Sequence, residues 1–144
     1  MQRIFIVVVL ILYAGLLGAQ DSWSTLSMVT FKTEFDPSYG MEVKIPSLSP
    51  VVKAMEGKMI EVKGYIIPLT GKKEQSHFML SKLPQNMCFF CGKAGPETAM
   101  QVFMKDGIKV PYCDDKIKLS GILRINENSV DNLMYTLEQA VIIE

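Results

Sequence analysis

Six short segments of the chain alternate apolar and polar side chains with the period of two that a half-buried β-strand requires. They are Val29–Phe35, Ile60–Ile66, His77–Ser81, Met100–Met104, Ile117–Ile125 and Tyr135–Ile143. Gly64 and Gly121 stand inside two of these segments, where glycine allows bulges and sharp coiling. Short strands of this kind predict an all-β fold, a small five- or six-stranded OB-like barrel. A small β-sandwich fits the same pattern and stays open as the alternative.

Two other segments interrupt the strand pattern. Residues 50–56 predict a short helix, with Ser49 as N-cap, Pro50 at the first helical position and Gly57 at the end. Residues 84–98 contain two prolines, two glycines and two cysteines, which predict an ordered, cysteine-bearing loop. No linker rich in Pro, Gly and Ser divides the chain, so we expect residues 20–144 to form a single OB-like domain.

The first 19 residues have the pattern of a secretory signal peptide. Arg3 precedes an apolar run, and small residues then lead to a cleavage point between Ala19 and Gln20. The apolar run is shorter than the roughly 20 residues that a membrane-spanning helix needs, which favours cleavage over a retained anchor. The first cysteine is Cys88, too far along for a lipid anchor at the N-terminus. The mature chain is therefore predicted to be periplasmic or extracellular, without a membrane span.

Charge gives no sign of a polyanionic partner. The chain has 15 basic and 15 acidic residues, and signal cleavage removes only Arg3 among them, leaving a formal charge near −1. No nucleic-acid partner is expected for such a chain. A single histidine, with neither a G-x-S-x-G motif nor a phosphate-binding glycine loop, also gives no hydrolase or nucleotide site. We expect a binding protein and not an enzyme.

The three cysteines carry the candidate chemistry. Cys88 and Cys91 form a Cys-x-x-Cys motif, and Gly92 allows a positive φ that leaves backbone amides free to face the sulfurs. This pattern predicts a transition-metal site, with zinc as the first candidate and copper as the second. Zinc takes four ligands, and the remaining ones would come from Cys113, His77, Asp114 or Asp115. The 21 residues between Cys91 and Cys113 hold a strand and its return, so their ends could meet.

The same cysteines allow two other interpretations. Cys88 and Cys91 could act as a thiol-disulfide pair, although redox motifs of this spacing begin a helix, and here a glycine and a proline follow within five residues. They could also form a structural disulfide in a barrel that serves as an adaptor for other envelope proteins. Four methionines, Met79, Met87, Met100 and Met104, could offer thioether sulfur to Cu(I). Core packing is the preferred interpretation, because Met100 and Met104 have the inward spacing of a strand, and Met87 beside Cys88 is the one kept as a candidate ligand.

The order of several short motifs resembles an exported bacterial family, DUF3299, a domain of unknown function. The matching residues are Gly57-Lys58, Gly64-Tyr65, Pro68-Leu69, Phe78-Met79-Leu80, Cys88, Pro96, Val102 and Gly121-Ile122-Leu123. The resemblance covers most of the mature chain and implies a small OB-like barrel, with no established activity to carry over. Many relatives have C-x-H followed by several prolines where this chain has Cys88-Phe89-Phe90-Cys91 and only Pro96. A histidine near the place of the second cysteine favours a metal site over a disulfide.

Overall fold

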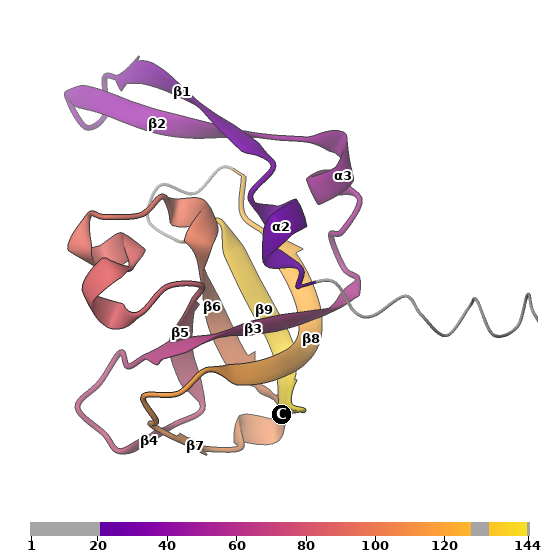
Figure 1. Ribbon diagram of the computed structural model, residues 1–144. Helices are drawn as coiled ribbons and strands as arrows, with labels where there is room; N and C mark the ends of the chain where they lie inside the picture. Colours follow the sequence, from indigo (N-terminus) through magenta and orange to yellow (C-terminus); the bar gives the residue numbers. More distant parts are fainter. Residues whose placement is uncertain (1–20, 128–132, 144) are drawn as a thin grey trace, which may run out of the picture.

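The computed structural model describes residues 21–127 and 133–143, so the predicted signal peptide lies outside the described residues. Five strands form a closed barrel in the order β3-β5-β6-β9-β8, and β8 pairs back to β3 (Figure 1). The strands are β3 (Met59–Ile67), β5 (His77–Ser81), β6 (Ala99–Met104), β8 (Ile117–Ile125) and β9 (Tyr135–Ile142).

The connectivity of this barrel is that of an OB fold. Neighbouring strands run antiparallel except β6 and β9, which run parallel. Numbered along the chain, the barrel strands therefore follow the order 1-2-3-5-4-1, a five-stranded Greek key. The predicted small all-β barrel is confirmed. The sandwich alternative is wrong, because the sheet closes on itself.

Two glycines let the strands of the barrel approach one another closely. A β-carbon at Gly64 would lie 2.6 Å from the carbonyl oxygen of Ser81, and one at Gly121 would lie 2.8 Å from that of Glu138. The pairing of β8 with β9 also shifts register at Gly121. Any larger residue at either position would push one strand off its neighbour. Both glycines thus allow the sharp coiling that closure requires.

The side chains inside the barrel follow the predicted alternation. The core includes Val62, Phe78, Leu80, Val102, Leu119 and Leu137, all at most 1% exposed. The alternation also predicts Met79 and Ser81 on the polar side of β5, yet both are buried. Met79 packs in a second apolar cluster with Cys88 of the following loop, so the loop covers this part of the outer wall.

A short helix at the start of the described chain packs into the barrel core. α2 (Trp23–Leu26) buries both Trp23 and Leu26 completely. The Trp23 indole N–H donates to the carbonyl oxygen of Lys63 at 2.9 Å, and the Tyr135 hydroxyl donates to that of Leu26 at 2.8 Å. These two bonds fasten the N-terminal segment to β3 and β9.

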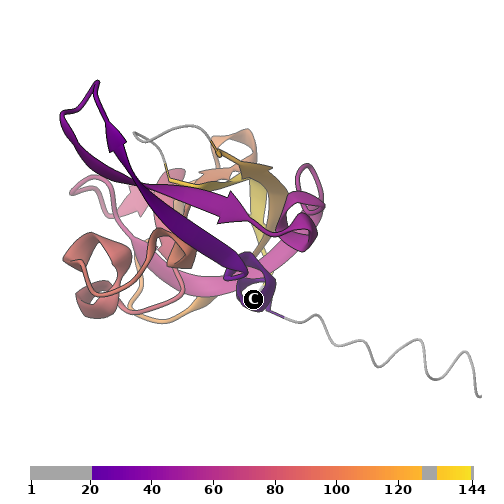
Figure 2. The same cartoon turned by 90° about the horizontal axis from the view of Figure 1, so that it is seen from above.

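A two-stranded hairpin lies outside the barrel and projects beyond it (Figures 1 and 2). β1 (Val29–Asp36) pairs antiparallel with β2 (Met41–Leu48), and most side chains of both strands are exposed. Its outer end carries the exposed apolar residues Phe35, Tyr39 and Met41. The predicted strand over Val29–Phe35 is therefore present, but it belongs to an exposed ribbon and not to the barrel wall.

Helix α3 (Pro50–Lys53) begins where the sequence predicts it. The Ser49 hydroxyl accepts a hydrogen bond from the Val52 N–H at 3.3 Å, and Pro50 occupies the first turn. The regular helix is shorter than the predicted span to residue 56, because turns replace it after Lys53. Gly57 then adopts a positive φ of 73°, which ends the segment and leads into β3.

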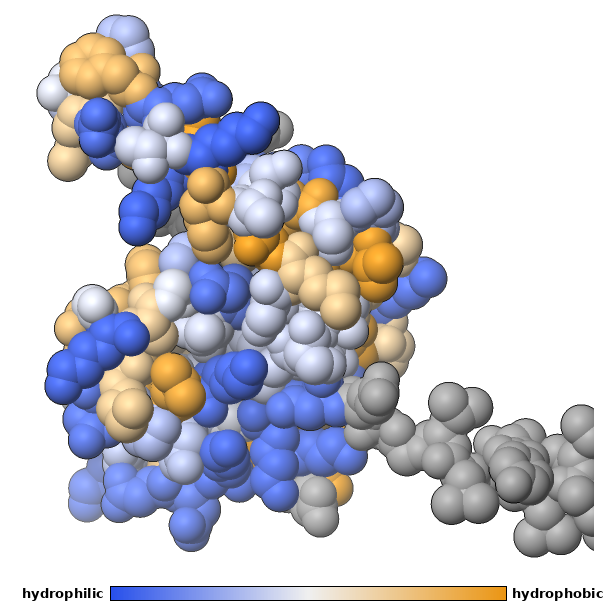
Figure 3. Space-filling model, turned by 45° about the horizontal axis from the view of Figure 1, so that its top comes forward, coloured by the Kyte–Doolittle hydropathy of each residue, from blue (hydrophilic) through white to orange (hydrophobic). Residues whose placement is uncertain are grey.

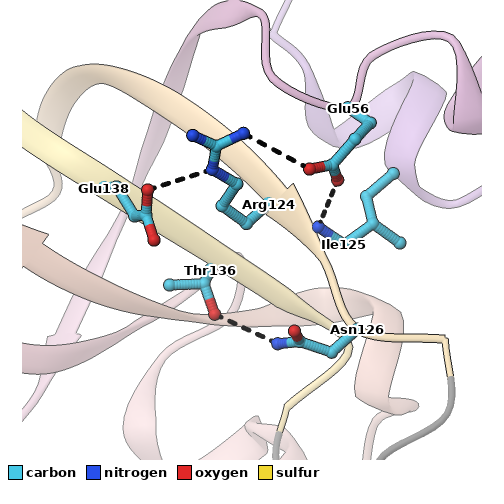
Figure 4. A network of polar contacts seen from close by, with 6 residues as sticks. All are labelled: Glu56, Arg124, Ile125, Asn126, Thr136 and Glu138. Atoms are coloured by element: carbon cyan, nitrogen blue, oxygen red, sulfur yellow. Dashed lines mark hydrogen bonds and ion pairs between the residues drawn. The ribbon is translucent and has the colours of Figure 1, made fainter.

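A polar network fastens this turn to the barrel (Figure 4). The Glu56 carboxylate accepts a hydrogen bond from the Ile125 N–H at 2.6 Å and pairs with Arg124 at 3.5 Å. Arg124 also pairs with Glu138 of β9 at 3.0 Å. The network joins the α3–β3 turn to β8 and β9.

The opposite end of the molecule carries shorter elements. β4 (Glu74–Gln75) pairs with β7 (Val110–Pro111), and the 3₁₀ turn η5 (Lys105–Gly107) follows β6. In the two described ranges, no helix has the length and apolar character needed to cross a membrane.

Candidate functional site

The cysteine-bearing loop between β5 and β6 is ordered, as the sequence predicts. It contains three 3₁₀ turns, η2 (Gln85–Met87), η3 (Phe89–Cys91) and η4 (Pro96–Thr98). Its two ends are joined, because the Lys82 N–H donates to the Thr98 carbonyl oxygen at 2.9 Å. Thr98 in turn donates its hydroxyl proton to the Gly95 carbonyl oxygen at 2.7 Å. The loop is thus a folded element with a closed base.

Cys88 and Cys91 come together at turn η3. The Cys91 N–H donates to the Cys88 carbonyl oxygen at 3.1 Å, which closes the turn between them. Gly92 follows with a φ of 70°, the left-handed conformation expected after the second cysteine. The two thiols are electrostatically coupled, because the charge of Cys88 acts on the Cys91 thiol. The two cysteines are therefore neighbours in one turn.

The two thiols of this pair differ in their surroundings. Cys88 is 1% exposed and packs with Ile67, Met79, Ala99 and Leu133. Cys91 is exposed, and its thiol donates to the Gln85 carbonyl oxygen at 3.0 Å. Desolvation, the hydrogen bond with Cys88 and the Cys88 charge raise the pKa of the Cys91 thiol above its ordinary value, against a lowering effect of Lys93. At neutral pH the Cys91 thiol is therefore mostly protonated when it holds no ligand.

Cys113 lies at a different end of the molecule. It follows β7 and packs against the main barrel core, whereas Cys88 belongs to the separate cluster outside the barrel wall. Its thiol lies 3.5 Å from the Asp115 carbonyl oxygen. The side chain of Asp114 is engaged by the Tyr112 hydroxyl at 2.8 Å. All three cysteines of the chain lie in the described ranges, and each is a free thiol.

His77 lies at the start of β5, on the outer wall of the barrel. Its ring stacks on Phe103 of β6, with the ring centroids 4.1 Å apart and an interplanar angle of 11°. Its Nε2 atom is buried and has no hydrogen-bond partner among the described residues. The stacking gives His77 a packing role on the wall.

The structure does not assemble the full predicted ligand set. Within residues 21–127 and 133–143, no three His, Cys, Asp or Glu side chains group as a metal site. Of the four predicted ligands, Cys88 and Cys91 share one turn, while Cys113 and His77 lie elsewhere in the fold. The interval between Cys91 and Cys113 does hold β6, but the chain returns to the other end of the barrel. Metal binding itself stays a prediction.

A groove of about 680 Å³ opens next to the cysteine pair. It is lined by residues of the hairpin, of strands β5 and β6, of the cysteine loop, and of the segments that end at residue 127 and begin at residue 133. Its apolar lining includes Phe31, Ile45, Met79, Phe89, Phe90 and Met134. Apolar side chains gather on the hairpin and the adjoining body in Figure 3, while the lower part of that face is hydrophilic.

Comparison with known proteins gives one similar solved structure. It is the crystal structure of a DUF3299 family protein from Pseudomonas aeruginosa PAO1, with 20% sequence identity and a TM-score of 0.45 over 66% of this chain and 67% of that chain. The chain is similar to a DUF3299 family protein. That family is the one whose motif order the sequence resembles. No family model matches the chain, and no curated protein matches it.

Sequence reasoning missed the groove and the residues that line it. The strand β2 supplies Val43 and Ile45, and although it begins with alternating apolar and charged residues, Pro46 interrupts the pattern and no strand is predicted there. A usable signal was present in the Cys-Phe-Phe-Cys motif. Its Phe89 and Phe90 both line the groove, and Phe90 is 50% exposed.

Proposed function

We propose that this protein is exported to the cell envelope and binds a transition-metal ion between the thiolates of Cys88 and Cys91. The observation that carries the proposal is that one 3₁₀ turn, closed by the bond from the Cys91 N–H to the Cys88 carbonyl oxygen, joins the two cysteines in a loop whose ends are also hydrogen-bonded. A pair of convergent thiolates is a strong chelate for a transition metal. The pair would hold the ion without any rearrangement of the barrel.

The unequal exposure of the two thiols favours a metal-handling role over a structural one. A structural metal site is closed by four protein ligands, which in the described ranges do not come together. Here Cys88 is fixed in an apolar cluster, while Cys91 opens to solvent. An ion held by one buried and one exposed thiolate remains accessible to a second ligand, as exchange with another protein requires.

The test is the metal content of the mature chain, purified under reducing and chelator-free conditions. Inductively coupled plasma mass spectrometry should find about one ion per chain. The double variant Cys88→Ser/Cys91→Ser should lose this ion, because it lacks both thiolates. The matched control is Cys113→Ser, which removes a thiol outside the pair and should keep the ion. Equal metal in the double variant and the wild type would contradict the proposal.

The thiol-disulfide alternative is distinguished in the same preparation. A pair that equilibrates with glutathione at a moderately oxidising potential and binds no metal would establish it. Two features weigh against it. The raised pKa of Cys91 reduces the thiolate that exchange needs, and no α-helix starts at the motif to stabilise that thiolate.

The adaptor alternative has one observation in its favour, the groove beside the cysteine pair. Its apolar lining suits an extended apolar segment of an envelope protein, and β2 borders it with four consecutive residues, 43–46. A photo-crosslinking amino acid at Phe90 should trap a defined partner in the envelope. The matched control is Tyr112, which is 42% exposed against 50% for Phe90 but lies outside the groove. Identical products from both positions would exclude the groove as a partner site.

A further inference from the structure

The number and chemical type of the atoms around the cysteine pair select among metal ions. Zinc takes four ligands in a structural site and three protein ligands in a catalytic one. Among the described residues, no third His, Cys, Asp or Glu joins Cys88 and Cys91. Soft monovalent ions such as Cu(I) bind to thiolate and thioether sulfur and need fewer ligands. The pair therefore has the ligand count of a soft-ion site.

One further sulfur atom belongs to the same environment. Met79 is 8% exposed and packs in the same apolar cluster as Cys88 on the outer wall of the barrel. It also lines the groove beside the loop. Met87 is adjacent to Cys88 in sequence, yet it is 50% exposed and lies outside that cluster. Sequence position favours Met87 as the thioether ligand, but the fold places Met79, and not Met87, in the cluster that contains Cys88.

We propose that the ion is Cu(I), held by the thiolates of Cys88 and Cys91 with the Met79 thioether as third ligand. This inference rests on the proposed function, because it names the ion that the same thiol pair takes. Binding releases two protons, one from each thiol, and forms two Cu–S(thiolate) bonds with no change in oxidation state. The resulting complex carries one negative charge. Lys93, which acts electrostatically on Cys91, partly compensates that charge.

The apolar cluster also explains why a thioether ligand suits this position. Met79 has no charge to desolvate, so it can remain buried whether or not the ion is present. Cys88 beside it is held by the same packing, which leaves Cys91 as the ligand that adjusts. A carboxylate or imidazole at position 79 would need a polar partner whenever no ion is bound.

The test is anaerobic titration of the reduced mature chain with Cu(I) and, separately, with Zn(II), each against a chromophoric competitor. Bicinchoninate serves for Cu(I) and a pyridylazo dye serves for Zn(II). We expect about one Cu(I) per chain, bound on the order of a thousandfold more tightly than Zn(II), because soft sulfur ligands select Cu(I). X-ray absorption at the copper edge should show three sulfur neighbours.

The variants separate the third ligand from simple packing. Met79→Leu keeps the volume and apolar character of the side chain, so the fold should persist, as circular dichroism can check. It should weaken Cu(I) binding about tenfold and reduce the sulfur neighbours at copper to two. Met87→Leu is the matched control and should leave both quantities unchanged.

Each failure points to a different conclusion. No binding of either metal would overturn the proposed function together with this inference. Zn(II) bound as tightly as Cu(I) would leave the proposed function standing and overturn the choice of ion. Unchanged Cu(I) affinity and coordination in Met79→Leu would overturn the third ligand alone, and a loss in Met87→Leu would transfer that role to Met87.

Discussion

The two regions that hold the cysteines differ in how their thiols were brought into place. In the loop between β5 and β6, Cys88 and Cys91 meet because one 3₁₀ turn joins them, so local backbone geometry is sufficient. Cys113 follows β7 at the other end of the barrel and packs against a different apolar cluster. For Cys113 to join the pair, the barrel topology would have to return it to the same end. Cys88 and Cys91, three residues apart, share one turn, whereas the 21 residues between Cys91 and Cys113 lead to a different part of the barrel.

The two regions also differ in the solvent exposure of their thiols. The loop pairs a thiol that is 1% exposed with one that is open to solvent. The turn after β7 has a single, half-buried thiol held near a backbone carbonyl. A pair with unequal exposure can fix an ion on one side and release it on the other. A lone thiol has no partner with which to form such a chelate.

The largest expected difference is in alkylation rate. In the reduced, metal-free protein, iodoacetamide should modify Cys91 at least about a hundredfold faster than Cys88, because Cys88 reacts only when the loop opens locally. Cys113 should react at an intermediate rate, in keeping with its half-buried side chain. Peptide mapping by mass spectrometry as a function of time measures all three rates.

The control for this experiment is the same reaction in concentrated urea, where the three rates should become similar. Similar rates for Cys88 and Cys91 in the native protein would mean that the cluster around Cys88 does not protect it. The proposed difference between Cys88 as a fixed ligand and Cys91 as an exposed one would then be wrong.

A smaller difference is expected in stability. Cys88→Ser places a hydroxyl among apolar side chains and should lower the free energy of unfolding by about 1–3 kcal/mol. Cys91→Ser changes an exposed side chain and should stay within about 0.5 kcal/mol of the wild type. Urea unfolding of the reduced, metal-free proteins measures both values. Equal losses for the two variants would show that the loop is stabilised evenly and that Cys88 is no special anchor.

Much of the barrel could be predicted because its strands carry their own signal. Val62, Phe78 and Leu119 point inward in strands that alternate regularly, and Gly64 and Gly121 mark the close approaches. Strand β2 was harder to predict, because Pro46 interrupts the alternation of Met41, Val43 and Ile45 with charged residues. Met79 was equally inaccessible to pattern analysis, since it is buried by a loop that follows it in the chain.

The candidate site was predictable to the extent that it is local. The Cys-x-x-Cys spacing and Gly92 fix the turn, and the structure shows both. The positions of His77 and Cys113 depend on strand order, which spacing along the chain does not determine. Spacing along the chain controls distance only within a turn. It therefore could not show whether Cys113 and His77 lie near Cys88 and Cys91.

The smallest expected difference is in the pH dependence of alkylation. The rate at Cys91 follows its thiolate, so the raised pKa should place the midpoint of the profile above that of an ordinary cysteine. Lys93→Ala removes a positive charge that lowers this pKa, so the midpoint should move further up. Cys88→Ala removes a hydrogen bond and a like charge that raise the pKa, so the midpoint should move down.

This last experiment is informative because the two variants should move the midpoint of the Cys91 alkylation profile in opposite directions. General loosening of the loop would relieve desolvation in both variants and shift both midpoints down. Opposite shifts at Cys91, with the Cys113 profile unchanged in both variants, require Lys93 and Cys88 to act directly on the exposed thiol. The loop would then be a coupled pair with its own counter-charge, while the turn after β7 holds an independent thiol. A Cys113 profile that moved with Lys93→Ala would contradict the separation of the two regions.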